Sequence, residues 1–248
     1  LTKEQIIKIC NRNFLGCDQL ILIEKDKSAD AFLKFYNSDG GESGACGNGT
    51  RCVADLISKE SNNKSVVLKT ISGNLKSEIL GNNIVTTEIG KAKTEWNEIP
   101  LSEKLDTKNL NIKISDKDHK EHSGGTAVNV GNPHIIFFVN EIDNFDIKKI
   151  GPNIENLKIF PEKCNVTIAQ VIDENLIKVK VWERGAGLTK ACGTAACATA
   201  FAGKLNNLTN NITDIEFENG KLTISIDEKN SIHMKGPVSD VKKIEIKL

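Results

Sequence analysis

The sequence has no excess of charge of either sign, because 33 basic and 33 acidic residues are spread over its 248 residues. Nucleic-acid-binding and membrane-surface proteins need a basic excess, so the balance argues against both classes. No apolar run approaches the roughly 20 residues of a transmembrane helix, and no signal-peptide pattern opens the sequence. Seven cysteines, an odd number at irregular spacing, argue against a secreted disulfide framework. We therefore expect a cytoplasmic protein with reduced thiols.

The composition and local patterns predict a mixed fold. Hydrophobic residues make up 39% of the chain, enough for one large or two small domains. Thr2 and Gln5 are placed as the capping box of an N-terminal helix. Apolar periodicity predicts further helices over 50–59 and 194–205. Alternation and turn residues predict strands or hairpins over the following ranges: 20–24, 32–36, 65–89, 126–130, 135–139, 166–171 and 176–182.

Two stretches, 42–52 and 187–197, are almost copies of each other. Each places a cysteine and a glycine, Cys46-Gly47 and Cys192-Gly193, at the start of an expected helix. A helix start offers unpaired N–H groups and the positive end of the helix dipole, both of which favour negative charge. We therefore expect a lowered pKa for both thiols, with thiolates accessible near neutral pH.

The two halves of the sequence repeat with a shift of 146 residues. This shift aligns Cys46 with Cys192 and Asn37 with Glu183, and it preserves the order of strand, Cys-Gly, helix and hairpin. We infer an α+β fold of two similar α/β domains, related by a pseudo-two-fold, with the active site in the interdomain cleft. The expected domains are residues 1–92, completed by 238–248, and residues 93–237. The polar stretch 90–122 is expected to hold the crossing between them.

Opposed helix starts of this kind support proton transfer at a carbon centre. Their N–H groups can hold an α-carboxylate and stabilise the charge that develops when the α-proton leaves. One thiolate would remove that proton, while the opposite thiol would supply another from the far face and invert the centre. This chemistry requires no cofactor.

The cysteines allow other interpretations. A cysteine in a reduced chain is by base rate a small core residue, and this is what we expect of the other five cysteines: Cys10, Cys17, Cys52, Cys164 and Cys197. The Cys-x5-Cys and Cys-x4-Cys spacings, with four histidines, do not fit structural zinc, so no metal site is expected. Neither glycine-rich stretch carries the Gly-Lys-Ser/Thr ending of a phosphate loop.

Six motifs stand in order along the chain: Gly16-Cys17-Asp18-Gln19, Asn37-Ser38-Asp39-Gly40, 46–52, Gly131-Asn132-Pro133-His134, Glu183-Arg184-Gly185 and Ala191-Cys192-Gly193-Thr194. Through these motifs the sequence resembles the diaminopimelate epimerase family of cofactor-independent amino-acid racemases. The resemblance implies two similar domains, each a curved, mostly antiparallel sheet around a central helix. It also implies a homodimer that uses no cofactor and interconverts LL- and meso-2,6-diaminopimelate for lysine and peptidoglycan precursor synthesis.

The resemblance also assigns roles to residues. Cys46 and Cys192 would be the two acid/base thiols, and His134 and Glu183 would tune their protonation. Arg184 would bind the distal carboxylate. The remaining substrate-binding residues would be Gln19, Asn37, Gly47, Asn48, Asn132, Asn165, Glu183, Gly193 and Thr194. Simpler interpretations exist: a lone Asn such as Asn165 is usually a turn residue, and Arg184 could be a surface charge.

The sequence departs from the family pattern in three places. Ala195 stands where the family usually has Gly, and Gly41 where it has Ser; both changes are small. The family also begins with a strand and a Gly-Leu-Gly-Asn-Asp-like loop, so we expect about two dozen residues ahead of Leu1. Two alternative functions remain: a proline or hydroxyproline racemase, and a non-catalytic amino-acid-binding protein. The presence of both Cys46 and Cys192 argues against the non-catalytic alternative.

Overall fold

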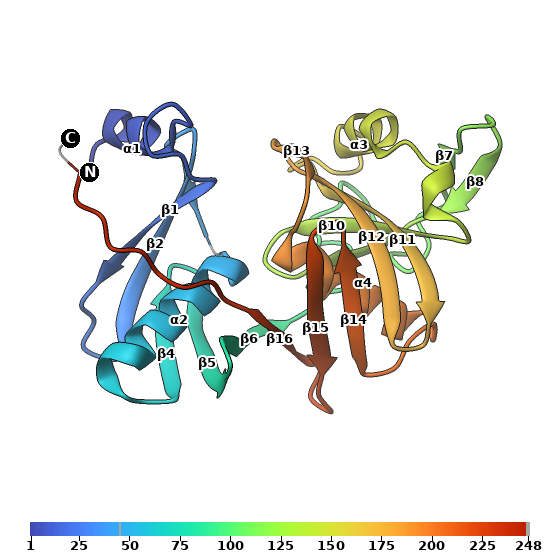
Figure 1. The fold of residues 1–248 in the computed structure, drawn as a ribbon. Helices are drawn as coiled ribbons and strands as arrows, with labels where there is room; N and C mark the ends of the chain where they lie inside the picture. The colour runs from blue at the N-terminus through green and yellow to red at the C-terminus, as the bar shows by residue number, and fades with distance from the viewer. Residues whose placement is uncertain (45, 247–248) are drawn as a thin grey trace. The chain divides into compact units, whose positions relative to one another are not determined.

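The computed structural model describes residues 1–44 and 46–246, and the chain divides into two compact units (Figure 1). Unit 1 comprises Leu1–Glu88 and Pro237–Leu248, and unit 2 comprises Ile89–Gly236. The C-terminal segment therefore returns to the unit that holds the N-terminus. Within the described residues, no helix is long and apolar enough to cross a membrane.

Unit 1 is a β-sheet with one helix against it and a second helix at its N-terminus. Helix α1 (Lys3–Cys10) begins with the predicted capping box of Thr2 and Gln5. The strand order is β1 (Gln19–Glu24), β2 (Ala31–Asn37), β4 (Ser65–Thr70), β5 (Gly73–Gly81) and β6 (Ile84–Lys91), and β3 (Glu42–Ser43) also pairs with β2. Helix α2 (Gly47–Ser61) contributes Val53 and Ala54 to the core of this sheet.

Unit 2 is built on a larger β-sheet. The strand order is β16 (Ser231–Pro237), β15 (Gly220–Ile226), β14 (Ile212–Phe217), β12 (Leu176–Glu183), β11 (Asn165–Asp173), β10 (Pro133–Val139) and β9 (Thr126–Asn129); β13 (Gly187–Thr189) pairs with β12. The other elements are the β7 (Ile112–Ser115) and β8 (Glu121–Gly124) hairpin, the 3-10 helix η1 (Ile142–Asn144), α3 (Ile147–Glu155) and α4 (Gly193–Leu205). The strands are mostly antiparallel, and β10 and β11 are parallel.

The two units share one topology, as the sequence repeat predicts. In unit 1 the chain forms β1, β2, β3, α2, β4 and β5, and in unit 2 it forms β11, β12, β13, α4, β14 and β15. In each unit the first three strands are joined antiparallel, the helix crosses to a strand parallel to the second, and a hairpin follows. The prediction of two similar α/β domains is therefore confirmed.

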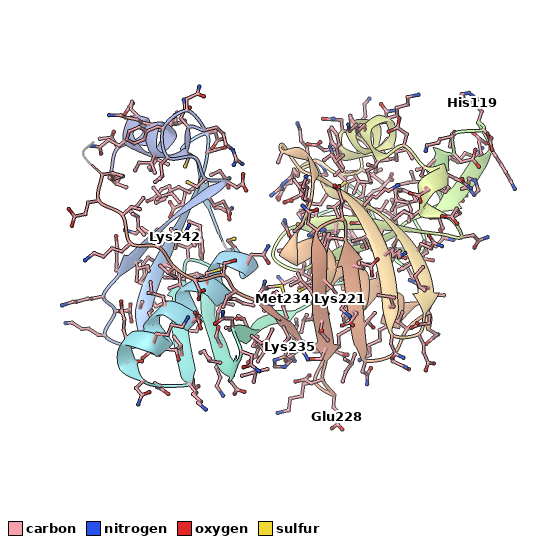
Figure 2. All side chains as sticks on the ribbon, viewed as in Figure 1. His119, Lys221, Glu228, Met234, Lys235 and Lys242 are labelled. Carbon is pink, nitrogen blue, oxygen red and sulfur yellow. The ribbon has the colours of Figure 1, made fainter. Side chains whose placement is uncertain are left out.

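The two repeated helices differ in burial because their sequences differ. Every residue of α4 from Ala195 to Gly203 is buried, since its small side chains let the helix lie inside unit 2. Helix α2 buries one face and exposes the other. Buried and exposed side chains alternate along the strands around α4. On β16, for example, Met234 is buried in the core and Lys235 is exposed (Figure 2).

Three features differ from what the sequence predicts. The stretch 90–122 does not serve merely as a crossing, because Ile99 and Leu101 are buried in a second core of unit 2. Helix α3 has no counterpart among the predicted helices. Cys52 is exposed, since it lies on the outer face of α2, so its expected core role is wrong. Of the other cysteines expected in the core, Cys10, Cys164 and Cys197 are buried, and Cys17 is half-buried.

Candidate active site

Cys46 is the N-cap residue of α2, and its thiol lies against the first turn. The Cys46 Sγ accepts a hydrogen bond from the Gly49 N–H at 3.3 Å. The Thr50 hydroxyl donates to the Cys46 carbonyl at 2.8 Å and fixes the backbone. A Cβ on residue 49 would lie 2.5 Å from Ile21 Cδ1 and 3.3 Å from the sulfur, so glycine allows this close approach.

Cys192 is the N-cap residue of α4, the equivalent position of unit 2, but its surroundings differ. Within the described residues, the Cys192 side chain makes no capping hydrogen bond. Its Sγ lies 3.4 Å from the Thr194 hydroxyl oxygen, and the residue is only 6% exposed. The Glu183 carboxylate at the end of β12 also interacts with this thiol.

The expectation that both helix starts lower the thiol pKa is wrong for this structure. Burial raises the pKa of Cys46, although the N–H groups of Gly49 and Asn48 act in the opposite direction. Burial also raises the pKa of Cys192, and the negative charge of Glu183 raises it further against the weaker influence of Thr194 and Ala195. Desolvation of the thiolate therefore outweighs the N–H groups at both helix starts. Both cysteines are thiols at neutral pH, and Cys46 is the easier one to ionise.

In unit 1, two predicted substrate-binding side chains meet across neighbouring strands. Gln19 opens β1 and pairs in register with Asn37, the last residue of β2. The Gln19 Nε2 donates to the Asn37 Oδ1 at 3.0 Å. Asn48, in the first turn of α2, accepts from Arg51 Nη2 at 3.1 Å. The structure thus brings Gln19 and Asn37 together, and it turns Asn48 toward its own helix.

In unit 2, the residues at the matching strand ends form a more buried network. Asn165, at the start of β11, is 2% exposed and corresponds in the repeat to Gln19. Its Oδ1 accepts from the Arg184 N–H at 3.0 Å, and its Nδ2 donates to the Pro133 carbonyl at 3.0 Å. Asn165 is therefore a structural anchor of the turn that follows β12, and not the turn residue that its isolation in the sequence indicates.

His134 lies beside this anchor on β10. Its Nε2 is 2.8 Å from Asn132 Oδ1 and 3.5 Å from Asn165 Nδ2. The ring is fully buried, and burial, together with the positive charge of Arg184, lowers the pKa of His134 to about 3. The imidazole is therefore neutral at physiological pH and positions Asn132 rather than carrying a charge.

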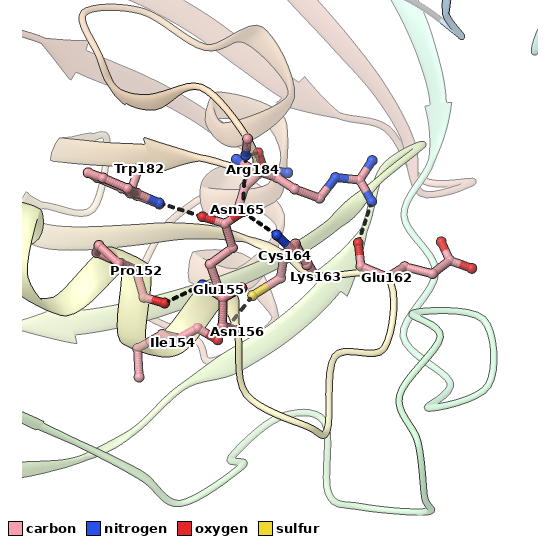
Figure 3. Close-up of polar contacts among 11 residues, drawn as sticks. Pro152, Ile154, Glu155, Asn156, Glu162, Lys163, Cys164, Asn165, Trp182 and Arg184 are labelled. Carbon is pink, nitrogen blue, oxygen red and sulfur yellow. Dashed lines mark hydrogen bonds and ion pairs between the residues drawn. The ribbon is translucent and has the colours of Figure 1, made fainter.

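Arg184 lies in the turn between β12 and β13. This turn needs glycine, because Gly185 and Gly187 have φ values of +73° and +83°. The Arg184 Nη1 donates to the Glu162 carbonyl at 2.8 Å, which holds one side of the guanidinium (Figure 3). The side chain is thus held near the surface of unit 2 and retains further donors for an anion.

The sequence did not identify every group that contacts the thiols. The N–H groups that act on the sulfurs belong to Asn48, Gly49 and Ala195, whereas Gly47 and Gly193 are the first residues of their helices. The N-cap rule could have found Gly49 and Ala195, because a capping side chain bonds the N–H two or three residues ahead.

Two surface recesses of unit 2 lie elsewhere. One lies between the β7–β8 hairpin and α3, with Asp116 and Lys149 in its wall, and the other is lined by apolar residues that include Leu110 and Leu157. The predicted site residues are not among the residues lining either recess. In residues 1–44 and 46–246, no cluster of three or more His, Cys, Asp or Glu side chains could hold a metal ion.

Comparisons with known proteins identify the family. The family model described as diaminopimelate epimerase matches residues 1–95 and 126–241. A diaminopimelate epimerase of Pelagibacter ubique is 69% identical over 248 residues, which cover 100% of this chain and 90% of that protein. A diaminopimelate epimerase of Acidiphilium cryptum is 40% identical over 225 residues, which cover 91% of this chain and 79% of that protein.

A solved structure of lower identity shares the fold. The hydroxyproline epimerase of Agrobacterium vitis, crystallised with trans-4-hydroxy-L-proline, has a TM-score of 0.67. It is 12% identical, and the match covers 94% of this chain and 76% of that chain. With the family model matched over most of the sequence and relatives of high identity, the chain belongs to the diaminopimelate epimerase family.

Proposed function

We propose that this protein is an isomerase that interconverts LL- and meso-2,6-diaminopimelate by a two-base thiol mechanism. The observation that carries the proposal is the presence of Cys46 and Cys192 as the N-cap residues of equivalent helices in two repeated units. The 69% identity to a protein named for this reaction supports the choice of substrate.

The surroundings of the thiols favour different resting roles for them. Cys46 has the Gly49 and Asn48 N–H groups to stabilise a thiolate, so it is the thiol that ionises more readily and then acts as the base that removes the α-proton. Cys192 is held as a thiol by burial and by Glu183, so it is the acid that returns a proton to the opposite face of the same carbon. After one turnover the two protonation states are exchanged, and the reverse reaction starts from that state.

The helix starts also supply electrostatic stabilisation. The first N–H groups of α2 and α4 have no partner within their own helices, and they can donate to the carboxylate of the reacting centre. Removing the α-proton places negative charge on that carboxylate, and N–H groups aimed at it stabilise the transition state more than the substrate.

Arg184 suits the far end of a dicarboxylic substrate. Its guanidinium is fixed on one side by the Glu162 carbonyl, and it can offer its other donors to a second carboxylate in bidentate geometry. A proline-type substrate has no second carboxylate. The likeness to the hydroxyproline epimerase, at 12% identity, extends to the fold alone. Proline-type racemisation is therefore not favoured.

The setting of this activity follows from the family resemblance. We infer a cytoplasmic homodimer that needs no cofactor and whose product serves lysine and peptidoglycan precursor synthesis. Size-exclusion chromatography with light scattering measures the oligomeric state directly, and a purely monomeric protein contradicts the homodimer.

The substrate assay is direct. Purified protein is incubated with LL-diaminopimelate and, in parallel, with trans-4-hydroxy-L-proline, and the stereoisomers are separated by chiral chromatography. We expect meso-diaminopimelate to form and hydroxyproline to remain unchanged. Epimerisation of hydroxyproline alone supports the racemase alternative, whereas binding of diaminopimelate without turnover supports a non-catalytic protein.

A further inference from the structure

A buried carboxylate that the proposed chemistry does not use lies behind the Arg184 turn. Glu155 is the last residue of α3 and is only 5% exposed. A buried carboxylate is costly unless hydrogen bonds and charges satisfy it. Glu155 is well satisfied. Its Oε2 accepts from Trp182 Nε1 at 2.7 Å (Figure 3), and its Oε1 accepts from the Gly185 N–H at 3.0 Å.

The two donors flank the residues to which the chemistry is assigned. Trp182 immediately precedes Glu183, and Gly185 immediately follows Arg184. A single carboxylate therefore holds both ends of the Glu183-Arg184 dipeptide. The Asn165 Oδ1 holds the same dipeptide from a second element, through the Arg184 N–H at 3.0 Å.

Helix α3 is also packed closely enough to hold Glu155 in place. A Cβ on Gly151, one turn before Glu155, would lie 2.3 Å from Trp182 Cγ, so glycine lets the helix backbone rest against the indole. Because Gly151 and Glu155 are four residues apart, they lie on the same face of α3. The same face thus carries the packing contact and the hydrogen-bonded carboxylate.

The chemistry of the contact requires a carboxylate rather than an amide. Three donors face Glu155: the Trp182 indole N–H, the Gly185 N–H and the Lys163 ammonium, whose Nζ is 3.9 Å from Oε1. The buried Cys164 thiol is also near enough for the charge of Glu155 to raise its pKa, after the larger effect of burial. A carboxylate accepts at both oxygens, whereas a glutamine would turn its NH2 group toward one of the two N–H donors. An uncharged isostere of the same size therefore breaks one of the two hydrogen bonds.

We propose that Glu155 is a positioning residue, which sets the place of the Glu183 carboxylate beside Cys192 and of the Arg184 guanidinium toward the substrate. It does not touch the reacting atoms. This inference rests on the proposed function for its effect on turnover, but its effect on Cys192 is a property of the protein without substrate. Loss of the Glu155 contacts loosens the turn, so Glu183 spends less time at the thiol.

The test compares Glu155→Gln with the wild type and with Lys163→Gln. The control removes only the exposed cation on the same carboxylate, at 3.9 Å, where an ion pair contributes little. Two quantities are measured: the kinetics with diaminopimelate, and the pH dependence of iodoacetamide labelling at Cys192 and Cys46, read by peptide mass spectrometry.

In Glu155→Gln we expect KM to rise roughly tenfold, because the turn that carries Arg184 loses one of its anchors. Labelling of Cys192 becomes roughly threefold faster at pH 8, because the Glu183 carboxylate is less well placed and its charge disfavours the Cys192 thiolate less. Labelling of Cys46 in unit 1 does not change. Lys163→Gln keeps wild-type values. A purely structural role lowers the melting temperature without moving either the KM or the Cys192 profile, and that result overturns the proposal.

A second variant covers the case in which Glu155→Gln does not fold. Trp182→Phe removes the indole donor and keeps the Gly185 bond, so we expect the same shift of the Cys192 profile at smaller size; a wild-type profile contradicts the proposal. In the double variant Glu155→Gln/Trp182→Phe, the glutamine side-chain oxygen can accept from the Gly185 N–H, and no indole N–H faces its NH2 group. We therefore expect its KM to lie between those of the wild type and Glu155→Gln. If the wild type does not turn over diaminopimelate, the proposed function fails, and the labelling profiles still decide the role of Glu155.

Discussion

The first turns of α2 and α4 start with the same residue pair and yet treat their thiols differently. In α2, the Cys46 sulfur accepts a backbone N–H and is half-buried. In α4, Cys192 is almost fully buried beside a hydroxyl and a carboxylate. The repeat therefore supplies a common scaffold, and local substitutions give the two thiols different surroundings.

The substitution with the greatest consequence is at the end of the second strand of each unit. Unit 1 has Asn37 there, a neutral amide bonded to Gln19, whereas unit 2 has Glu183, whose negative charge raises the pKa of Cys192. Burial is the largest cause of the raised pKa at both cysteines; at Cys46 the Gly49 and Asn48 N–H groups act against it, whereas at Cys192 the negative charge of Glu183 adds to it. The two thiols therefore differ both in the N–H groups of their own helix starts and in the side chain that ends the second strand of each unit.

The largest expected effect is that of removing either thiol. We expect Cys46→Ser and Cys192→Ser each to lower kcat for epimerisation by at least about 100-fold, because a serine hydroxyl is a far weaker proton donor and acceptor at neutral pH. Chiral chromatography of the reaction measures this. Cys52→Ser, an exposed cysteine of α2, is the matched control and should keep wild-type turnover. Unchanged turnover in Cys192→Ser contradicts the mechanism.

The next largest effect is expected from removing the guanidinium of Arg184, a proposed substrate-binding group that unit 1 lacks at the equivalent position. Position 184 is Arg in unit 2, and its equivalent in unit 1 is Ser38. We expect Arg184→Ser to raise KM for diaminopimelate roughly 10- to 100-fold, since a charge-assisted hydrogen bond contributes about 1.5–3 kcal/mol. Steady-state kinetics measures this, with Lys190→Ala, an exposed cation of unit 2, as the control. An unchanged KM removes Arg184 from the binding site.

The pKa difference between the thiols is open to a direct measurement in the protein without substrate. Because both pKa values are raised, labelling by iodoacetamide should increase with pH at both cysteines. At each pH between 7 and 10, we expect Cys46 to react faster than Cys192.

Glu183→Gln sharpens this comparison. Removing the negative charge lowers the pKa of Cys192, so its labelling rate should move toward that of Cys46. Glu218→Gln, which removes an exposed carboxylate of the same unit, is the control. If Cys192 reacts faster than Cys46 in the wild type, the assignment of resting base and acid is reversed.

Much of this comparison could be predicted from the sequence. The 146-residue shift predicted the shared topology, and the Cys-Gly pairs predicted the helix starts, because both are local patterns with a fixed spacing. The pKa direction could not be predicted, since it depends on how deeply each sulfur is buried by distant residues. Cys192, for example, belongs to the buried core formed around the small-residue helix α4.

The contacts of Glu155 with the turn that carries Arg184 could not be predicted from the sequence either. Glu155 ends a short helix that contains Gly151 and Pro152, both of which weaken a helical prediction. Its partners, Trp182 and Gly185, are about thirty residues away in sequence, so only the packing of α3 on β12 reveals the contact. Cys52 shows a different error: it was expected in the core because most cysteines of a reduced chain lie there, but its position on α2 turns it outward.

The smallest expected effect concerns the third residue of each helix, Gly49 in α2 and Ala195 in α4. In Gly49→Ala, the gain in helix propensity of about 1 kcal/mol is offset by the shift of Ile21, so the melting temperature should change by only a few degrees. The new methyl group crowds the Cys46 sulfur, which is 3.3 Å away, and labelling of Cys46 should slow. Ala195→Gly is the reciprocal variant and should leave the Cys192 profile unchanged. Equal labelling changes in both variants contradict the proposed difference between the helix starts.

Proton transfer between two different thiols is the central claim, and exchange with deuterated water tests it most directly. LL-diaminopimelate is incubated with the protein in deuterium oxide, and the isotopic content of both stereoisomers is followed by mass spectrometry from the first turnover. Because the acid thiol carries a solvent deuteron while the base removes the substrate proton, we predict deuterium in the meso product before it enters the remaining LL substrate. A product that keeps the original proton, or a substrate that exchanges as fast as product forms, contradicts the two-base account.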